Sequence, residues 1–564
     1  MKIFSSCFWS VLLALLGTWA DLCAQNSYAN LDHNYNLLVD RYEIQSGKHS
    51  SYFHGGVKPL SRPDVAAFAD TLFSNEALKK SKLDDFNLQY LCVDNWEWSK
   101  HAKSKSLDQP VPKIYTKKSD FFYVKEPNFS LHLNPIIHFG MGSDPLIAPN
   151  RVFINARGAE IYGTVGQRIG YYASVAETQA RFPRYIRNEI DSFNVVPNEA
   201  FWKDFRNGGV DFITSRGYIT WRMAKVVHAQ FGHDRHFLGH GFRSLALSDY
   251  AAPYLFLKLR TQVWKIQYTN LFAQLTADVL RANNVYPKKY MVNHHLSMNI
   301  LPNLNVGLFE SVVYGRKDNR VNDGIELGYL NPLIFYRSIE QNLGSADNAF
   351  LGLDAKYSFM KSFQIYTQVV LDEFVLKEVM NRKGWWGNKQ GIQLGAKYIN
   401  VGGINNLDLQ IEYNTVRPYT YTHFNFEELS NYAHYRQSMA HPMGANFKET
   451  LLIVRYQPYK KFTLTSKIIS AVFGEDSDGK NWGGNILKDN TTYVQEYGNK
   501  TGQGVKANLL IADFLGSYQF RHNLFFDGRI TYRNKQSQDD KLDLSSVIVH
   551  LAVRLNIATR PYDF

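Results

Sequence analysis

Cysteine is scarce in this sequence: only three of its 564 residues are Cys. If an N-terminal signal is removed after Ala24, Cys92 is the one that remains. A single thiol cannot form an internal disulfide, and it cannot supply a metal site built on several thiolates. The sequence therefore excludes a disulfide framework and a cysteine-rich metal site as sources of stability.

Long apolar runs are also missing beyond the N-terminus. Residues 1–2 carry a positive charge, residues 8–16 are apolar, and small residues stand at Ala20 and Ala24. This pattern is typical of a secretory signal peptide, and it predicts that residues 1–24 are removed, with cleavage after Ala20 or Ala24. No later stretch approaches the roughly 20 apolar residues of a membrane-spanning helix. A bundle of membrane helices is thus excluded.

Nucleic-acid signatures are absent as well. The net charge is +12, but the sequence has no basic helix, zinc-finger spacing or RNP-like motif. A basic protein surface also attracts anionic lipid head groups and acidic polysaccharide. We therefore expect no nucleic-acid partner.

Aromatic residues, in contrast, are plentiful: 35 Tyr, 37 Phe and 10 Trp make up 15% of the chain. This share is high for a soluble enzyme and ordinary for a membrane barrel with aromatic girdles. From about residue 127 onward, apolar and polar residues alternate. The clearest run has Leu407, Leu409, Ile411 and Tyr413 alternating with Asp408, Gln410, Glu412 and Asn414. Alternation predicts strands with one apolar face, in either a soluble sandwich or an outer-membrane barrel.

The lengths of the predicted connections separate these two architectures. The alternation predicts strands near 150–158 and 163–174, with a connection between them. Farther along the chain, short connections at 301–302 and 360–361 alternate with long ones at 232–252, 314–350 and 415–447. Short periplasmic turns and long outer loops are the pattern of outer-membrane barrels. We therefore predict an all-β fold, in which residues 127–564 form a transmembrane antiparallel β-barrel of about 18 strands. Residues 325–330 are placed in a loop, because a strand there would break the alternation.

Both ends of the mature chain depart from this pattern. Residues 25–126 carry helix signals, such as Pro63 in the first turn of a helix, and predict a small, mostly helical periplasmic unit. At the other end, Phe564 suits the last residue of an outer-membrane barrel, but Arg560 interrupts the final alternation. Residues 559–564 are therefore either the end of the last strand or a short tail beyond it.

A polar stretch at residues 231–259 is the first candidate site. Its histidines could ligate zinc, but their loop spacing fixes no coordination geometry. We instead predict a structural hydrogen-bonded loop network at the mouth of the barrel, on its outer side, formed by His233, Asp234, His236 and Asp249. Ser244, His240 and Asp249 also invite a hydrolase triad, but the G-x-S-x-G turn of many hydrolases is missing. We expect no metal and no catalytic residues.

Two other segments have the composition of a sugar-binding surface. Residues 415–447 interleave Tyr, Phe and His with Arg, Asn and Gln, and residues 384–389 add two adjacent indoles. Aromatic faces stack on sugar rings, while guanidinium and amide groups bind hydroxyls and carboxylates. The predicted glycan-binding residues are Arg243, Trp385, Trp386, Arg417, Tyr419, His434 and Arg436. For each of these residues the alternative is a structural role, either as an aromatic of the membrane-interface girdle or as part of a loop that packs on itself.

Several long motifs carry a family resemblance. They are FGHDRHFLGHGFRSLALSD at 231–249, PYLFLK at 253–258, NPLIFYRSIEQNLGSADNAFLGLD at 331–354, GWWGNKQGIQLGAKY at 384–398, and RPYTYTHFNF with HYRQSMAHPMGANF within 417–447. The sequence resembles the Wzi-type capsule-assembly outer-membrane proteins, and most closely their RemB-like gliding-motility branch. The resemblance implies a barrel of about 18 strands with a periplasmic helical bundle. It implies no catalytic centre.

Together, the residues and the resemblance predict a non-enzymatic protein of the Gram-negative outer membrane. It would bind or organise surface polysaccharide in capsule assembly or attachment, or support cell-surface adhesion in gliding motility. A channel for small solutes is the alternative, and an outer-membrane hydrolase is less favoured. The expected partners are surface polysaccharide, outer-membrane lipid and the barrel-assembly machinery, with no cofactor. The oligomeric state stays open.

Overall fold

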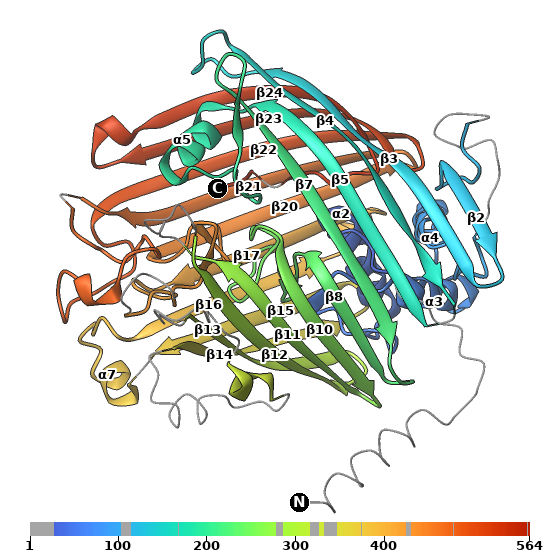
Figure 1. The fold of residues 1–564 in the computed structure, drawn as a ribbon, viewed down its shortest axis with the longest axis horizontal. Helices are drawn as coiled ribbons and strands as arrows, with labels where there is room; N and C mark the ends of the chain where they lie inside the picture. Colours follow the sequence, from blue (N-terminus) through green and yellow to red (C-terminus); the bar gives the residue numbers. More distant parts are fainter. Residues whose placement is uncertain are drawn as a thin grey trace, which may run out of the picture.

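The computed structural model describes residues 27–102, 114–166, 168–277, 286–315, 326–331, 347–373, 375–424, 430–477, 479–560 and 562–564. Within these ranges, 18 antiparallel strands form a closed barrel (Figure 1). The predicted barrel and its strand number are therefore confirmed. The predicted signal peptide lies outside the described residues. No helix in the described ranges is long and apolar enough to cross a membrane.

The barrel strands follow one another in chain order, and the last strand pairs with the first to close the wall. They are β3 (Phe129–Ser143), β4 (Arg151–Val165), β5 (Ile169–Arg181), β7 (Gly209–Arg222), β8 (Val227–Asp234), β10 (Tyr254–Val263), β11 (Ile266–Thr276), β12 (Lys288–Leu301), β13 (Leu304–Tyr314), β14 (Asn348–Phe359), β15 (Phe363–Glu373), β16 (Lys389–Tyr398), β17 (Leu407–Val416), β20 (Phe447–Tyr459), β21 (Phe462–Glu475), β22 (Val505–Arg521), β23 (Leu524–Ser537) and β24 (Leu544–Leu555).

The remaining elements are not among these 18 strands. They are α2 (His33–Ser46), α3 (Arg62–Ser74), α4 (Lys82–Asp94), α5 (Arg184–Phe193), α7 (Leu376–Asn381), β1 (Val57–Lys58), β2 (Phe122–Glu126), β6 (Lys203–Phe205), β9 (Phe237–Leu238), β18 (Ala433–His434), β19 (Gln437–Ser438), η2 (Leu327–Leu330), η3 (Val401–Gly403), η4 (Asn490–Thr492) and η5 (Asp540–Leu542). Residues 327–330, placed in a loop by the sequence, form the short 3-10 helix η2.

The first turns of the barrel differ from the sequence prediction. The alternation placed a connection between residues 158 and 163, but β4 continues through both positions. A Cβ on Gly158 would stand 1.9 Å from the Val175 carbonyl oxygen, and one on Gly163 would stand 2.0 Å from that of Ser130. These glycines permit close contact between neighbouring strands, which the sequence pattern does not distinguish from a turn.

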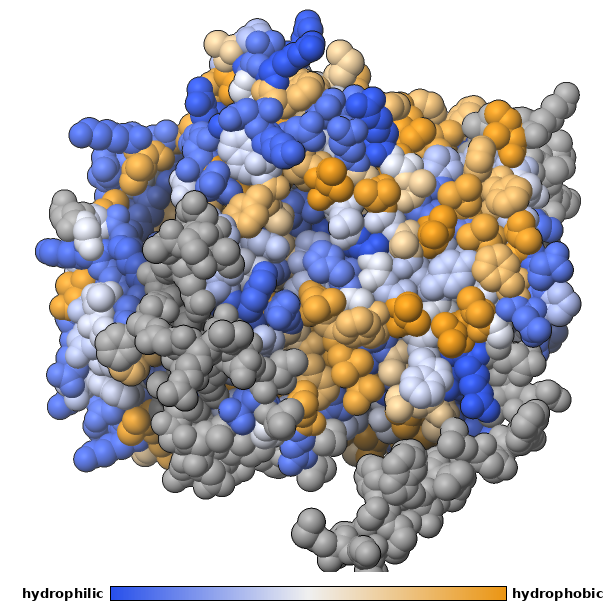
Figure 2. Space-filling view, in the orientation of Figure 1, coloured by the Kyte–Doolittle hydropathy of each residue, from blue (hydrophilic) through white to orange (hydrophobic). Residues whose placement is uncertain are grey.

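The alternation of residues in the strands has the predicted consequence for their two faces. In β17, Ile411 and Tyr413 are 48% and 37% exposed on the outside, whereas Gln410 and Glu412 are 4% and 0% exposed inside. Figure 2 shows apolar side chains running across the barrel wall. An apolar outer face with polar groups inside suits a wall surrounded by lipid.

Three N-terminal helices, α2, α3 and α4, occupy the barrel end with the short turns (Figure 1). Side-chain caps fix where two of these helices begin. The Asp32 side chain accepts a hydrogen bond from the Asn34 N–H at the start of α2, and Ser81 forms a capping box with Asp84 at the start of α4. They are attached to the wall by polar contacts. Tyr90 donates to Asn523 Oδ1 at 2.7 Å.

One connection between strands enters the barrel. Residues 235–253, here called the inner loop, leave β8 and cross the lumen before β10, and their short strand β9 pairs with β1 of the N-terminal region. The prediction that this stretch lies at the outer mouth was therefore wrong. The physical reason is its apolar content: Leu245, Leu247 and Ala251 are at most 1% exposed.

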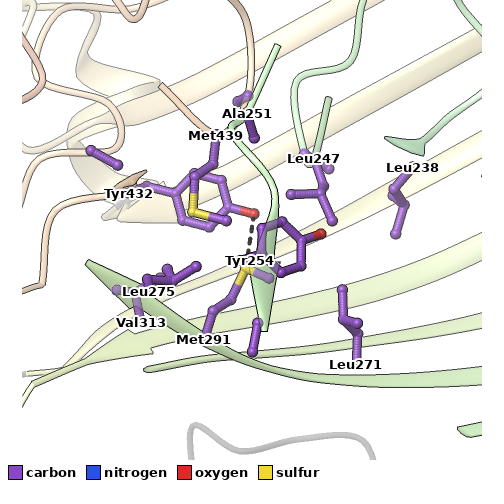
Figure 3. Packing of buried hydrophobic residues seen from close by; sticks show 14 of the residues in the cluster. Leu238, Leu247, Ala251, Tyr254, Leu271, Leu275, Met291, Val313, Tyr432 and Met439 are labelled. Carbon is purple, nitrogen blue, oxygen red and sulfur yellow. Dashed lines mark hydrogen bonds between the residues drawn. The ribbon is translucent and has the colours of Figure 1, made fainter. Parts of the chain in front are cut away.

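These apolar residues build a core inside the lumen. Figure 3 shows Leu247 and Ala251 of the inner loop packed among wall residues Leu271, Met291 and Val313. Tyr432 and Met439, from the β17–β20 connection, complete the cluster. The inner face of β11–β13 is therefore partly apolar, because it meets a folded loop there instead of water.

The C-terminus also turns inward. β24 ends at Leu555, and the described residues that follow it form a tail inside the barrel, where the C-terminal label lies in Figure 1. Lys467 Nζ lies 2.6 Å from Asp563 Oδ2, and Arg533 donates to the Phe564 carbonyl oxygen at 3.1 Å. Of the two alternatives for residues 559–564, the short tail is correct.

Candidate functional site

Arg243 of the inner loop is the centre of an ion-pair network in the lumen. Its guanidinium lies 3.2 Å from Glu449 Oε1 and 3.3 Å from Asp563 Oδ1. Burial alone would raise the pKa of the Asp563 carboxyl, but Lys467 and Arg243 outweigh burial and lower this pKa. The network therefore joins the inner loop, the wall and the C-terminal tail.

The backbone of the inner loop is held by inward-facing side chains of the wall. Glu412 accepts hydrogen bonds from the Phe242 N–H at 2.7 Å and the Arg243 N–H at 3.1 Å. Gln368 accepts one from the Leu245 N–H at 2.7 Å, and Gln393 donates to the Arg243 carbonyl at 3.0 Å. Buried backbone groups thus find partners without forming regular structure.

The N-terminal region fixes the same loop from the other side. Lys58 donates to the Gly239 carbonyl at 3.0 Å, and Lys397 contacts both Asp40 Oδ2, at 2.6 Å, and the His240 carbonyl, at 2.9 Å. Burial opposes ionisation of Asp40, but Lys397 outweighs it and lowers the pKa of Asp40 to about 2. The helical unit and the inner loop therefore form one continuous filling of the lumen.

The structure separates the residues of the hypothetical hydrolase triad. His240 Nε2 lies 3.0 Å from Asp354 Oδ1, and Asp249 pairs with His33 at 2.8 Å. The Ser244 hydroxyl accepts hydrogen bonds from the Ala246 and Leu247 N–H groups, both at 3.1 Å. Each group therefore serves the packing of the inner loop through a partner of its own.

The predicted loop network is divided in the same way. His233 Nδ1 lies 3.1 Å from the Ser215 carbonyl, and His236 Nδ1 lies 3.2 Å from the Tyr254 hydroxyl. Asp234 faces Arg216 at 4.0 Å, and Asp249 binds His33 as described above. These four residues thus attach one stretch to three elements, β7, β10 and α2, instead of bonding to one another. In the described part of the chain, no group of three or more His, Cys, Asp or Glu side chains is arranged to hold a metal ion.

Three long connections bring four of the predicted sugar-binding residues together at the other end of the barrel. We call this group, completed by Tyr493 and Lys389, the outer aromatic cluster; it contains Trp385, Trp386, Lys389, Arg417, Tyr419 and Tyr493. Trp386 stacks on Tyr493 with ring centroids 4.5 Å apart and meets Tyr419 edge-on at 6.3 Å. Trp385 lies 5.9 Å from Trp386, and both indoles are half-buried. The cluster therefore offers the partly open rings of Trp385, Trp386 and Tyr493, while Tyr419 is fully buried.

Cationic groups flank these rings. Lys389 Nζ stands 5.5 Å from the ring centroid of Trp386. Arg417 is half-buried and donates to the backbone carbonyl of Asn388 at 2.7 Å. Burial lowers the pKa of Arg417 from its ordinary value. Arg417 therefore holds the β15–β16 connection against its own loop.

The β17–β20 connection carries an unusual backbone. Tyr419, Tyr421, Tyr435 and Arg436 have φ angles of 66°, 72°, 49° and 59°. Non-glycine residues in this region cost of order 1–3 kcal/mol each, and they persist where surrounding contacts fix them. Here Tyr421 donates to the Leu245 carbonyl at 2.6 Å, and Tyr419 donates to that of Asn481 at 2.9 Å. The strained loop is thus locked onto the inner loop and the β21–β22 connection.

The remaining predicted residues lie elsewhere. His434 is 2% exposed, and its Nε2 lies 3.1 Å from the Pro253 carbonyl. Arg436 lies over the ring of Tyr286 at 5.8 Å, where Phe201 stacks on the same tyrosine at 5.0 Å. Arg243 is in the lumen network. The structure therefore brings Trp385, Trp386, Arg417 and Tyr419 together and leaves the other three apart.

Sequence reasoning missed several neighbours of these residues. Tyr493 and Lys389 complete the outer aromatic cluster, and Phe201 and Tyr286 accompany Arg436. Tyr493 stands in a long connection without a repeated aromatic pattern, so only the fold reveals its position beside Trp386. Lys389 is the last residue of the 384–389 segment, so its closeness in sequence to the two indoles could have indicated it as a member of the cluster.

Solved structures of other outer-membrane barrels are similar to this architecture. The solved structure of Wzi, an outer-membrane protein involved in group 1 capsule assembly in Escherichia coli, aligns with a TM-score of 0.55 at 12% identity, covering 95% of this chain and all of Wzi. OprD of Pseudomonas aeruginosa and OccAB4 of Acinetobacter baumannii align with TM-scores of 0.41 at 10% and 8% identity, covering 75% and 76% of this chain and 94% and 98% of theirs. No curated protein sequence matches the chain.

The sequence family is identified by a separate comparison. The family model described as capsule assembly protein Wzi matches residues 150–532, which is most of the barrel. The fold and this match place the protein in the outer membrane of a Gram-negative cell. The chain belongs to the Wzi capsule assembly family.

Proposed function

We propose that this protein holds surface polysaccharide at the outer aromatic cluster, as a binding protein without catalytic activity. The observation that carries the proposal is the convergence of Trp385, Trp386, Arg417 and Tyr419 from separate connections onto one outer site. Half-buried indoles stack on sugar rings, and the half-buried Arg417 guanidinium is a donor for sugar hydroxyls or carboxylates. Such contacts are individually weak, so a long polymer would be held through many of them.

The family supports this proposal. The E. coli relative is described as a carbohydrate-binding β-barrel involved in capsule assembly. The channel alternative is less favoured here, because the inner loop and the N-terminal helices fill much of the lumen. Cell-surface adhesion in gliding motility stays a prediction, and it is compatible with the same saccharide-holding surface.

The substitution Trp386→Ala tests the site. It removes the ring that stacks on Tyr493, and we expect about tenfold weaker binding of capsular polysaccharide, since one aromatic contact is worth roughly 0.5–1.5 kcal/mol beyond its area. Binding would be measured with purified capsular or exopolysaccharide and protein in a detergent without a sugar head group. The double variant Trp385→Ala/Trp386→Ala should lose binding altogether.

A matched control is available at the opposite end of the barrel. Trp264 is 74% exposed in the turn between β10 and β11, so Trp264→Ala removes an exposed indole without touching the outer loops. This control should bind like the unmodified protein. Equal binding by all variants would remove the outer aromatic cluster from the proposal, and failure of the unmodified protein to bind would reject the function itself.

A further inference from the structure

A second, interior cavity lies at the periplasmic end of the barrel. It is enclosed by α2, α4 and the inner faces of β20–β24, β3 and β4. Its lining is dominated by carboxamides and hydroxyls, which are the groups that recognise sugar hydroxyls. Among the described residues, the side chains of Asn34, Thr463, Thr465 and Gln519 line it and make no hydrogen bond to the protein. They are free to bind a ligand.

Aromatic rings accompany these polar groups. Tyr35, Tyr90 and Phe525 line the same cavity. The Tyr90 hydroxyl is held by Asn523 at 2.7 Å, and Arg554 covers one face of Phe525 at 4.9 Å. Rings fixed beside free amides and hydroxyls combine stacking with hydrogen bonding, the combination that sugar recognition uses.

The charges of the cavity favour an acidic ligand. Arg455, Lys460 and Lys461 line it, and within the described chain none of the three forms a salt bridge. The acids are engaged instead. Asp32 accepts from the N–H groups that start α2, and Glu160 accepts hydrogen bonds from Asn30 and Tyr172. Asp94, the third acid of the lining, pairs with Arg62 at 2.9 Å. Five cationic side chains thus line the cavity beside three carboxylates, and this excess of positive charge attracts an anionic group.

This cavity continues into a second one along the wall. Leu515 and Arg554 line both, and the second cavity extends to α5 and the C-terminal tail, past Arg181, Arg529 and Arg560. The inner loop is bonded to the wall at β15–β17, and its Phe242 packs against Leu509 and Ile511 of β22, so the path passes beside the loop. The path therefore follows the inner wall for several strands.

We propose that this interior cavity is a second saccharide site, which takes a uronate-bearing oligosaccharide segment from the periplasmic side. Carboxylates of the sugar would meet Arg455 and Lys460, and its hydroxyls would meet Thr465 and Gln519. The site is separate from the outer aromatic cluster and uses none of its residues, so either one can exist without the other.

Binding of tetragalacturonic acid to the full-length protein in a non-sugar detergent tests the proposal, with maltotetraose as the neutral probe. We expect the acidic probe to bind and the neutral one to bind at least about tenfold more weakly, because charge-assisted hydrogen bonds are stronger than neutral ones. Arg455→Gln should weaken binding of the acidic probe about tenfold for the same reason. The variants are compared in the Trp385→Ala/Trp386→Ala background, so that the outer cluster does not contribute, and in that background Trp264→Ala should leave binding of the acidic probe unchanged.

Two tryptophan substitutions at neighbouring positions, one facing the cavity and one facing outward, test where the site lies. Thr465→Trp places an indole in the cavity and should abolish binding, whereas Leu464→Trp, at the neighbouring position that is 42% exposed on the outside, should not. Should Thr465→Trp fail to fold, Gln519→Ala serves instead, with an expected loss of about threefold to tenfold. The proposal is overturned if the unmodified protein does not bind the acidic probe, if both probes bind equally, if Arg455→Gln and the cavity variant bind normally, or if the Trp385→Ala/Trp386→Ala variant no longer binds the acidic probe.

Discussion

Replacing Arg243 with methionine is expected to lower the free energy of unfolding by about 3–5 kcal/mol, because it leaves buried charges without their partner. Arg243 is 7% exposed, and its loss would leave the Glu449 carboxylate with His441 and the Asp563 carboxylate with Lys467 alone. The inner loop would then be held by its backbone contacts to Glu412 and Gln368. Its attachment to the C-terminal tail would be lost.

The effect is measurable as a lower temperature of unfolding in detergent and as faster amide hydrogen exchange in residues 235–253. Arg157→Met is the matched control, since Arg157 is 57% exposed in its pair with Glu177, 3.6 Å away. Exposed pairs contribute about 0–1 kcal/mol, so the control should unfold like the unmodified protein. Equal stability of the two variants would show that the network does not hold the loop.

Acidification is expected to loosen the joint between the N-terminal region and the inner loop. Burial lowers the pKa of His54 to about 3, with Lys356 adding to the shift. Burial also lowers the pKa of His240 to about 4 against the opposing effect of Asp354. Both rings are 3% exposed. His54 contacts Ser297 Oγ at 2.7 Å, and His240 contacts Asp354. Both histidines are therefore neutral while the N-terminal region and the inner loop are packed against each other.

The direction of the pH effect follows from these depressed values. An unfolded histidine titrates near pH 6.5, so the stabilisation is complete above that pH and falls as the pH drops toward 4. At pH 4 each histidine would cost the closed joint about 3 kcal/mol. Hydrogen exchange in residues 49–58 and 235–247 should therefore accelerate between pH 6.5 and 4. Burial also lowers the pKa of His49, in the same segment, to about 2. His49→Gln/His54→Gln/His240→Gln should therefore remove most of this pH dependence, and an unchanged pH profile in that variant would contradict the assignment.

The barrel was predictable because its signal is periodic. Alternation in stretches such as 407–414 determines which face of each strand meets lipid, and loop lengths decide between a sandwich and a barrel. Gly158 and Gly163 misled the sequence prediction because a glycine that permits close strand contact resembles a glycine in a turn. The inward path of residues 235–253 was not predictable from alternation, since its apolar groups bury against a wall that the sequence expects to be polar.

The candidate site was predictable in part for a similar reason. Trp385, Trp386, Arg417 and Tyr419 were identified from local composition, and their connections meet in the fold. Arg243 has the same composition around it, but its partners Glu449 and Asp563 are distant in sequence. Composition indicates which side chains suit a sugar, whereas only the packing of the loops decides which of them face outward.

We propose that the barrel is filled and holds saccharide, and that it is not an open channel. Conductance of the purified protein in planar lipid bilayers at neutral pH distinguishes the two. The filled lumen, closed by the inner loop and the N-terminal helices, predicts no stable open-channel current, while Arg243→Met should show intermittent openings. A large, steady conductance of the unmodified protein would exclude a filled lumen and favour a solute channel.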